Sequence, residues 1–176
     1  MHGVLSLSQH LSDMRLSPES YRPKMCPCGF SKLWFHGSYT RKFVQYDLGD
    51  LRLDPVPVLR FYCPDCKHTC SVLPECIPPR SWFLWKTRQV IFLLLLAGNS
   101  LDRTHASNGS PVSRDSIKRW WRHFRSEFST YSFHLLTFFP CLGRHPELSD
   151  FWRTLLGLRS LSSAMLMLHQ EGVVVP

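Results

Sequence analysis

The pattern of hydrophobic and polar positions changes near the middle of the chain. Before residue 74, β-prone residues occur in short runs separated by Gly, Pro and Asp, which is typical of a small antiparallel sheet. From residue 81 onward, apolar residues recur at intervals of three and four, which is the period of an amphipathic helix. Residues 74–80 between the two patterns are rich in proline and predict a linker. The pattern therefore predicts an α+β protein, with a small sheet followed by an all-α region.

The β-rich part covers residues 25–73. His-Gly-Ser at residues 36–38 separates two β-prone runs and predicts a hairpin turn. Residues 47–57 contain Gly, Pro and Asp at loop-like density. The strands are expected at residues 33–35, 39–46, 58–62 and 69–73.

Two cysteine turns frame this sheet. The first contains Cys26 and Cys28 followed by Gly29, and the second contains Cys63 and Cys66 separated by Pro-Asp. Zinc takes four ligands in a tetrahedron, and two cysteines in a tight turn can direct both sulfurs at one ion. A sheet this small buries little apolar surface, so a bound metal would supply the missing stability. The spacing predicts a Zn²⁺ site in an antiparallel zinc ribbon.

Other ligand sets stay open at this point, because Cys-x-Cys is one residue shorter than the usual Cys-x-x-Cys turn. The main alternative keeps three of these cysteines and adds His36, His68 or Cys70. Four thiolates would also suit iron. Cys70, Cys76 and Cys141 are otherwise interpreted as small buried hydrophobic residues.

Residues 1–24 form an N-terminal arm of mixed polarity. Leucines predict a short amphipathic helix over residues 8–16, ended by Ser17-Pro18. A mobile arm is the alternative.

The helical part begins with three expected helices. Residues 82–97 predict a helix, with Ser81 as the expected N-cap and Gly98-Asn99 as the stop. After residue 89 this helix is apolar nearly all round, which predicts a central core helix. Residues 100–108 predict a short helix capped by Ser100. Residues 112–128 predict a strongly amphipathic helix.

The last of these helices is basic along one side. Arg114, Lys118, Arg122 and Arg125 fall on one face, and Arg119 borders it. Residues 81–128 thus predict a long helix, a short helix, a turn and a basic helix. This is the order of a helix-turn-helix, in which the last helix enters the major groove. Trp120 is expected in the core. The expected base or phosphate contacts are Ser113, Arg114 and Ser116, and the expected phosphate contacts are Lys118, Arg119 and Arg122.

Residues 129–176 form a C-terminal helical extension, with a helical stretch expected over residues 148–169. Its apolar residues would either complete the core or form a surface for dimerisation. The pattern does not separate these alternatives.

The charge of the chain is uneven. The formal net charge is +8. Residues 81–145 carry nine Lys or Arg and three Asp or Glu, so most of the excess lies in the helical part. A concentrated basic surface favours a polyanion such as nucleic acid. The longest apolar run, residues 90–97, is too short to span a bilayer, and the N-terminus lacks a signal-peptide pattern. We therefore expect a cytoplasmic protein without membrane contact.

Residues 24–128 resemble a known family. The resemblance rests on the two cysteine turns, on Arg-Phe-Tyr-Cys-Pro-Asp-Cys over residues 60–66 and on Ser-Arg-Asp-Ser-Ile-Lys-Arg-Trp over residues 113–120. With these features, this part of the chain is similar to the zinc-ribbon and helix-turn-helix front end of bacterial insertion-sequence transposases and their accessory proteins. The resemblance implies zinc ligands at the four cysteines of the turns. It places Arg114, Lys118 and Arg119 in a recognition helix.

The resemblance does not extend to catalysis. A transposase needs three carboxylates on a metal-dependent nuclease domain, and about 48 residues after the basic helix do not supply one. The sequence therefore predicts a non-enzymatic, zinc-dependent protein that reads double-stranded DNA as an accessory factor, regulator or remnant of a mobile element. Its expected partners are DNA and a transposase or a second copy of itself. The alternative is a protein-interaction or dimerising module that uses the ribbon and the C-terminal helix.

Overall fold

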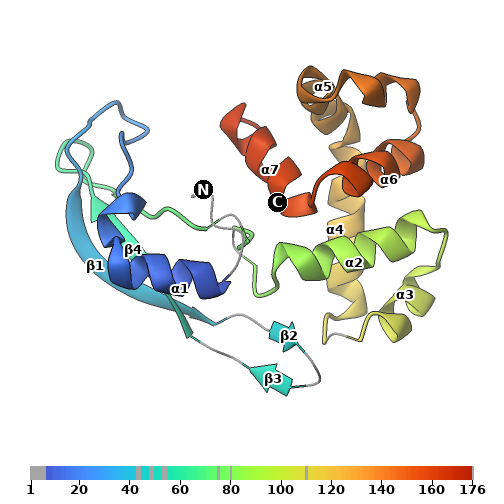
Figure 1. Cartoon of the computed structure of the whole chain (residues 1–176), viewed down its shortest axis with the longest axis horizontal. Helices are drawn as coiled ribbons and strands as arrows, with labels where there is room; N and C mark the ends of the chain where they lie inside the picture. The colour runs from blue at the N-terminus through green and yellow to red at the C-terminus, as the bar shows by residue number, and fades with distance from the viewer. Residues whose placement is uncertain are drawn as a thin grey trace. The chain divides into compact units, whose positions relative to one another are not determined.

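The computed structural model describes residues 7–42, 45–47, 50–52, 55–74, 76–79, 81–109 and 111–175. The chain divides into two compact units, Met1–Phe83 and Leu84–Pro176. The described residues contain seven α-helices, a three-stranded antiparallel sheet and a two-stranded ribbon (Figure 1). The fold is therefore of the mixed α+β type. The described elements of the second unit are helices, and the first unit contains both sheets together with the N-terminal helix.

The three-stranded sheet of the first unit has the order β1-β4-β5, with both pairs antiparallel. Its long strands β1 and β4 pair from Trp34↔Tyr62 to Lys42↔Pro55, and the short β5 joins beside Phe61 and Tyr62. β2 and β3 form a separate antiparallel ribbon. The strand bounds are β1 Trp34–Lys42, β2 Gln45–Asp47, β3 Asp50–Arg52, β4 Pro55–Tyr62 and β5 Thr69–Cys70.

Two sequence predictions for this sheet are wrong. Residues 36–38 do not form a hairpin turn, because β1 continues through them with a shift of register between Phe35 and Ser38. Gly37 has φ of +86°, so it accommodates a β-bulge where the pattern resembled a turn. Residues 47–57 are also not one loop, since β3 and the start of β4 lie within them. Backbone pairing with β1 overrides the proline content there.

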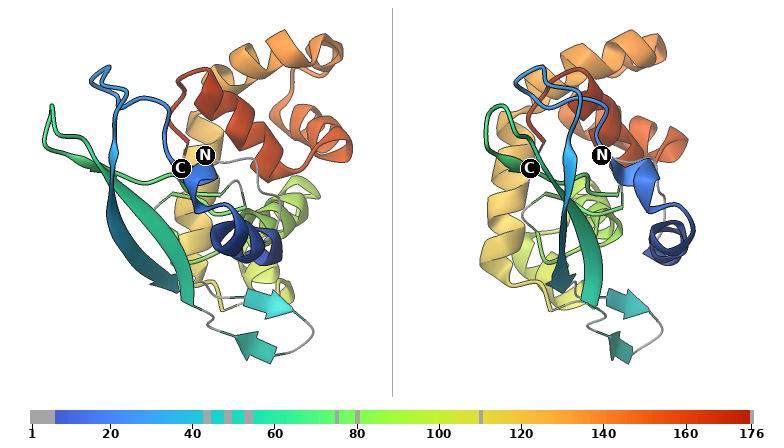
Figure 2. Two further views of the ribbon diagram at one scale, coloured as in Figure 1. Left: turned by 60° about the vertical axis from the view of Figure 1, so that its left-hand side comes forward. Right: turned by 90° about the vertical axis from the view of Figure 1, so that its left-hand side faces the viewer.

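The N-terminal helix α1, Leu7–Leu16, confirms the helix predicted over residues 8–16. It contacts β4 and lies along one face of the two long strands (Figures 1 and 2). The buried His10 joins them, since its Nε2 lies 2.9 Å from the carbonyl of Pro57 and its Nδ1 lies 2.7 Å from the hydroxyl of Tyr21. A carbonyl only accepts, so Nε2 donates to Pro57 and, in the neutral ring, Nδ1 accepts from Tyr21. Burial, Asp13 and Cys76 raise the pKa of Tyr21 to about 12, which keeps that donor protonated.

Replacing Tyr21 with phenylalanine should destabilise the first unit by about 1–2 kcal/mol, because buried Nδ1 of His10 loses its partner. Urea unfolding followed by circular dichroism measures this change. The matched control is Tyr62→Phe, which removes a hydroxyl from a half-buried ring and should change stability by less than about 0.5 kcal/mol. Equal stability of the two variants would refute the role of the His10 contact.

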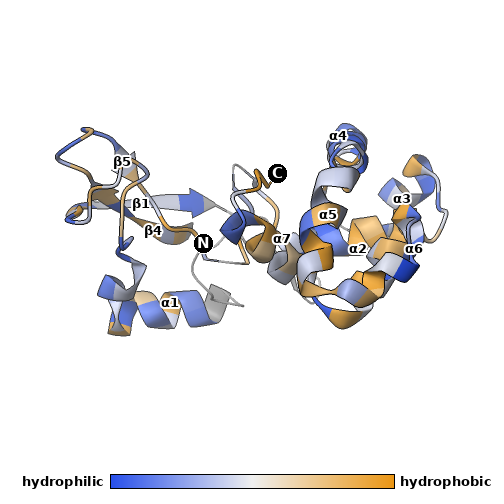
Figure 3. Cartoon of the chain, turned by 90° about the horizontal axis from the view of Figure 1, so that it is seen from above, coloured by the Kyte–Doolittle hydropathy of each residue, from blue (hydrophilic) through white to orange (hydrophobic). Residues whose placement is uncertain are grey.

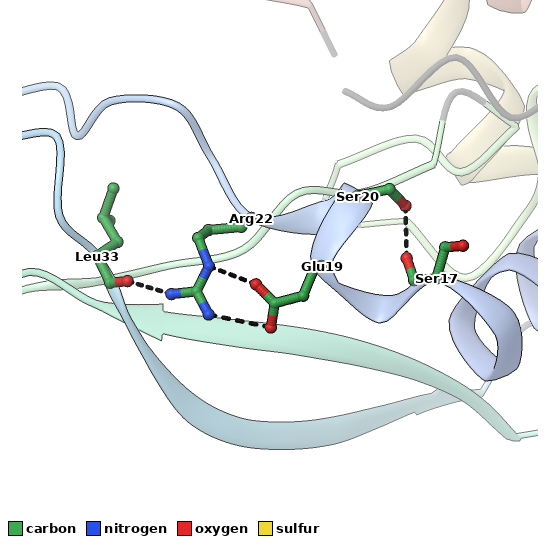
Figure 4. Close-up of polar contacts among 5 residues, drawn as sticks. All are labelled: Ser17, Glu19, Ser20, Arg22 and Leu33. Atoms are coloured by element: carbon green, nitrogen blue, oxygen red, sulfur yellow. Dashed lines mark hydrogen bonds and ion pairs between the residues drawn. The ribbon is translucent and has the colours of Figure 1, made fainter.

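A second connection ties the segment after α1 to the sheet. The 3-10 helix η1, Pro18–Tyr21, leads into Arg22. The Arg22 guanidinium pairs with Glu19 at 2.7 and 3.0 Å and donates to the carbonyl of Leu33 just before β1 (Figure 4). It also lies 5.3 Å from the ring centre of Phe61. Arg22 therefore positions the chain that carries the first cysteine turn.

The second unit consists of helices joined by short connections. Phe124 lies at its centre, with ring centroids 4.2 Å from Phe92 and 4.3 Å from Trp152. The bounds are α2 Trp85–Leu96, α3 Leu101–Ser107, α4 Arg114–Ser126, α5 Phe128–Phe138, η2 Pro140–Arg144, α6 Leu148–Leu158 and α7 Leu161–Gln170.

The start of α2 corrects the sequence prediction that Ser81 is an N-cap. The hydroxyl of Ser81 bonds to the carbonyl and the N–H of Phe83, 3.0 and 3.1 Å away, which makes a local turn. The helix therefore begins later, at Trp85, with Leu84 in the cap position. Nor is α2 buried all round, because Val90 and Leu93 are 45% and 40% exposed. Ser100 does cap α3, as predicted.

The C-terminal residues complete the core of the second unit. The predicted stretch 148–169 forms two helices, α6 and α7, which contact α2, and α7 also contacts α5. Their buried apolar residues are Phe151, Trp152, Leu155, Leu161, Ala164, Met165 and Leu168. Of the two alternatives for this segment, the structure therefore favours a core role. Across the described part of the chain, helices are too short or too polar to cross a bilayer.

Candidate metal centre and basic helix

The first cysteine turn is closed by its own backbone. The N–H of Gly29 donates to the carbonyl of Cys26 at 2.8 Å, and the N–H of Cys26 donates to the carbonyl of Phe30 at 2.8 Å. Gly29 has φ of +93°, a conformation that glycine adopts without steric cost. This bend lets the short Cys-x-Cys spacing direct both thiols to the same side. Cys26 is buried and Cys28 is exposed.

The second turn follows the end of β4. The N–H of Cys63 donates to the carbonyl of His68, and the N–H of Lys67 donates to the carbonyl of Cys63, both at 2.9 Å. Lys67 has φ of +60°, the left-handed conformation that closes the turn. Pairing of β4 with β5 fixes the far side of the turn. Cys63 is fully buried, and Cys66 is half-buried.

The two turns bring four sulfurs together. The Sγ atoms of Cys26 and Cys66 lie 3.6 Å apart, as do those of Cys28 and Cys63, and all four lie within 4.8 Å of one another. A tetrahedral zinc with Zn–S bonds of about 2.3 Å requires sulfurs about 3.8 Å apart. A disulfide would need about 2.05 Å. The four cysteines are therefore positioned to hold one metal ion as thiolates.

The protonation of these thiols reflects their crowding. Burial opposes ionisation of Cys63, but the N–H groups of Cys66 and Asp65 and the thiols of Cys28 and Cys66 lower its pKa to about 7. At Cys26, the backbone contact at Cys28 favours the thiolate, but burial and the thiols of Cys28, Cys66 and Cys63 raise the pKa to about 12. Four thiolates this close repel each other without a cation between them. The donor set therefore fits a soft divalent metal.

The alternative ligands lie outside this cluster. His36 stands beside Tyr62, with ring centroids 5.7 Å apart. His68 and Cys70 line a depression next to Cys26, Cys28 and Cys66, although neither belongs to the group of four. Cys70 is only half-buried, and Cys141 is exposed, which contradicts its interpretation as a buried thiol.

The basic helix α4 begins at a polar cap. The hydroxyl of Ser113 accepts from the N–H of Ser116 at 3.3 Å, and the two hydroxyls lie 3.0 Å apart. Both side chains were predicted to contact DNA. In the structure they close the first turn of the helix and fix its start. The basic stripe of α4, which consists of Lys118, Arg122 and Arg125, is therefore the main candidate for DNA contact.

The basic stripe of α4 borders a groove. Leu101 and Trp121 supply apolar lining, and Ser126 lies at one end. The helix is drawn mainly in hydrophilic colours in Figure 3, in contrast to α2. The cations that line the groove are Lys118, Arg122 and Arg125, all exposed.

Arg114 is held by a partner that sequence reasoning missed. Its Nε bonds to Oδ1 of Asp102 on α3, and a second nitrogen lies 3.4 Å from Oδ2. This hydrogen-bonded pair lowers the pKa of Asp102 and raises that of Arg114, so both stay charged. The pair joins α3 to α4 and neutralises one cation of the predicted DNA face. The residues are 12 apart in sequence, so no short-range pattern indicated it.

The side chain of Arg88 on α2 is buried and contacts α4 through Trp120. The guanidinium of Arg88 on α2 lies 4.6 Å from the ring centre of Trp120 and 5.0 Å from that of Trp85. Burial and nearby Arg119 lower the pKa of Arg88 to about 10, and Tyr131 opposes the shift. Trp120, which was expected in the core, is only half-buried and contacts this cation. Arg119 is close enough to act on Arg88, and it does not line the groove with Lys118, Arg122 and Arg125.

The chain was compared with known proteins at three levels. No family model matches it, and neither a curated protein nor a solved structure is similar enough to count as a match.

Proposed function

We propose that this protein is a zinc-dependent, non-enzymatic DNA-binding protein that reads double-stranded DNA with α4. The observation that carries the proposal is the one-sided basic stripe of α4, whose Lys118, Arg122 and Arg125 border one groove. Helix α4 follows α2 and α3 and contacts α3, which is the order and connection of a helix-turn-helix. Duplex DNA presents a regular array of phosphates that exposed arginines and lysines bind.

The metal has a structural role in this proposal. Zinc is the metal that best suits four thiolates at tetrahedral spacing, although the same donors accept iron. Zinc would hold the two turns of the first unit together and take no part in chemistry. Metal analysis and the colour of the purified protein distinguish the two, since a four-thiolate iron centre is coloured.

The mobile-element origin and a transposase partner rest on the sequence resemblance alone. In that setting the chain would act as an accessory factor or regulator in the cytoplasm, with DNA and a transposase or a second copy as partners. The interaction-module alternative is weaker, because the apolar residues of α6 and α7 that would carry it are buried within the second unit.

Duplex affinity should fall steeply with salt. Three phosphate contacts, by Lys118, Arg122 and Arg125, predict a slope of about −2.7 for the logarithm of the binding constant against that of the salt concentration. Fluorescence anisotropy with a labelled duplex measures this slope. A flat dependence, or no binding at low salt, would refute the proposal.

Replacing Asp102 with asparagine should strengthen duplex binding. The change releases Arg114 from its ion pair, and one additional phosphate contact is worth about eightfold at about 0.1 M salt. The double variant Asp102→Asn, Arg114→Ala is the control and should lose the gain. An equal gain in both variants would show that the effect comes from the lost negative charge and not from Arg114.

A further inference from the structure

At its end near the cysteine turns, the three-stranded sheet of the first unit has aromatic side chains on the face opposite the core cluster that contains Leu59 and Phe61. Successive side chains of a strand point to opposite faces. Leu59 and Phe61 of β4 belong to the core cluster with Tyr21, on the side that α1 contacts. Tyr62 and its cross-strand partner Trp34 therefore lie on the other face near the cysteine turns.

Three rings gather on this face. The ring centroid of Tyr62 lies 6.5 Å from that of Trp34 and 5.7 Å from that of His36. Trp34 is 61% exposed, and His36 is also exposed. An exposed tryptophan beside two other rings presents flat aromatic surface that the unit does not use for its own packing.

A cation completes the same strip. The guanidinium of Arg60, two residues before Tyr62 on β4, lies 5.7 Å from the ring centre of Tyr39. Its buried Nε has no hydrogen-bond partner. Exposed Lys32 and Lys67 flank the strands, and Asp65 is the acidic residue between the second pair of cysteines. The strip, which comprises Trp34, His36, Tyr39, Arg60 and Tyr62, therefore combines stacking surface with positive charge.

We propose that this aromatic strip binds unpaired bases of a single-stranded nucleic acid. Every base has a flat face that stacks on aromatic rings without regard to sequence, while its phosphates favour cations. The positive charge of Arg60, Lys32 and Lys67 beside the rings favours a polyanion, and a single strand supplies both phosphates and unstacked bases. The site is distinct from the groove of α4 and does not depend on duplex binding there.

The test uses the zinc-loaded full chain and fluorescein-labelled oligothymidine and oligouridine of about 15 nucleotides, a length that covers typical single-strand sites. Replacing Trp34 and Tyr62 together with alanine should weaken binding by on the order of tenfold or more. Phe133→Ala, which removes a 71% exposed ring of α5, should leave binding unchanged. Tighter binding of either strand supports the proposal and indicates whether DNA or RNA is the ligand.

Two further measurements distinguish binding at the aromatic strip from binding elsewhere on the protein. An abasic strand of equal length and charge should bind more weakly, because it cannot stack. Crosslinking of an iodouracil-containing strand to the unmodified chain should modify Trp34 or Tyr62, which tests the site even if the double variant fails to fold. Equal binding of the abasic strand, crosslinks confined to α4, or no binding of any strand would overturn the proposal.

Discussion

Replacing Cys63 with serine should release the metal and unfold the first unit. Cys63 is fully buried, and its sulfur lies 3.6 Å from that of Cys28. A structural zinc supplies about 10–16 kcal/mol of apparent binding energy in finger peptides. A domain is stable by only about 5–15 kcal/mol, so a small sheet with few buried residues cannot remain folded after this loss. Zinc quantification and thermal melting by circular dichroism measure both effects.

The chain supplies matched controls for this experiment. Cys141→Ser changes an exposed cysteine of the second unit, and Cys70→Ser changes a cysteine beside the cluster but outside it. Both variants should retain about one zinc per chain. The second unit has its own core around Phe124 and should keep its melting transition in Cys63→Ser. Unchanged zinc and melting in that variant would show that Cys63 is not a ligand.

Replacing Arg122 and Arg125 together with alanine should weaken duplex binding by roughly 60-fold at about 0.1 M salt, since each lost phosphate contact removes about 0.9 from the logarithmic salt slope. Both side chains are exposed and line the groove of α4, so the fold should be unaffected. Anisotropy titrations at several salt concentrations give the affinity and the slope in one experiment.

The matched control removes two arginines elsewhere. Arg144 in η2 and Arg159 after α6 are also exposed, and their replacement with alanine lowers the net charge by the same amount. This control should bind within about twofold of the unmodified protein if the contacts are local, because distant surface charges are screened. Similar losses in the two double variants would indicate that binding follows total charge and that α4 has no special role.

The metal cluster could be predicted from sequence because its chemistry is local. Each pair of cysteines lies within one tight turn, and zinc restricts both the ligand type and the number of ligands. The structure places the sulfurs of Cys26, Cys28, Cys63 and Cys66 together, as that reasoning required. The identity of the metal stays a prediction.

Other features could not be predicted, because they depend on contacts between distant residues. Gly37 predicts a turn by composition, but pairing with β4 makes it part of a bulged strand. Ser81 has the composition of a cap, but its hydroxyl bonds to Phe83 instead. The partners of His10 and Arg114 lie up to 47 and 12 residues away. No periodicity of 2 or 3.6 residues contains that information.

The boundary between the two units lies after the predicted linker, because tertiary contacts hold the linker segment to the first unit. Proline content predicted a linker at residues 74–80, of which 75 and 80 lie outside the described residues. The first unit extends through Phe83, and Ile77 within the expected linker is fully buried. Arg41 of β1 donates to the carbonyl of Ser81 at 3.0 Å, which ties this segment to the sheet.

Selection of bound sequences from a pool of random duplexes by the zinc-loaded full chain tests the central claim most directly. If α4 reads DNA, the retained duplexes should share a common sequence motif, and replacing Arg122 and Arg125 should abolish their retention. A retained pool with the same sequence composition as the input, or undiminished retention by that variant, would contradict the claim that this helix reads double-stranded DNA.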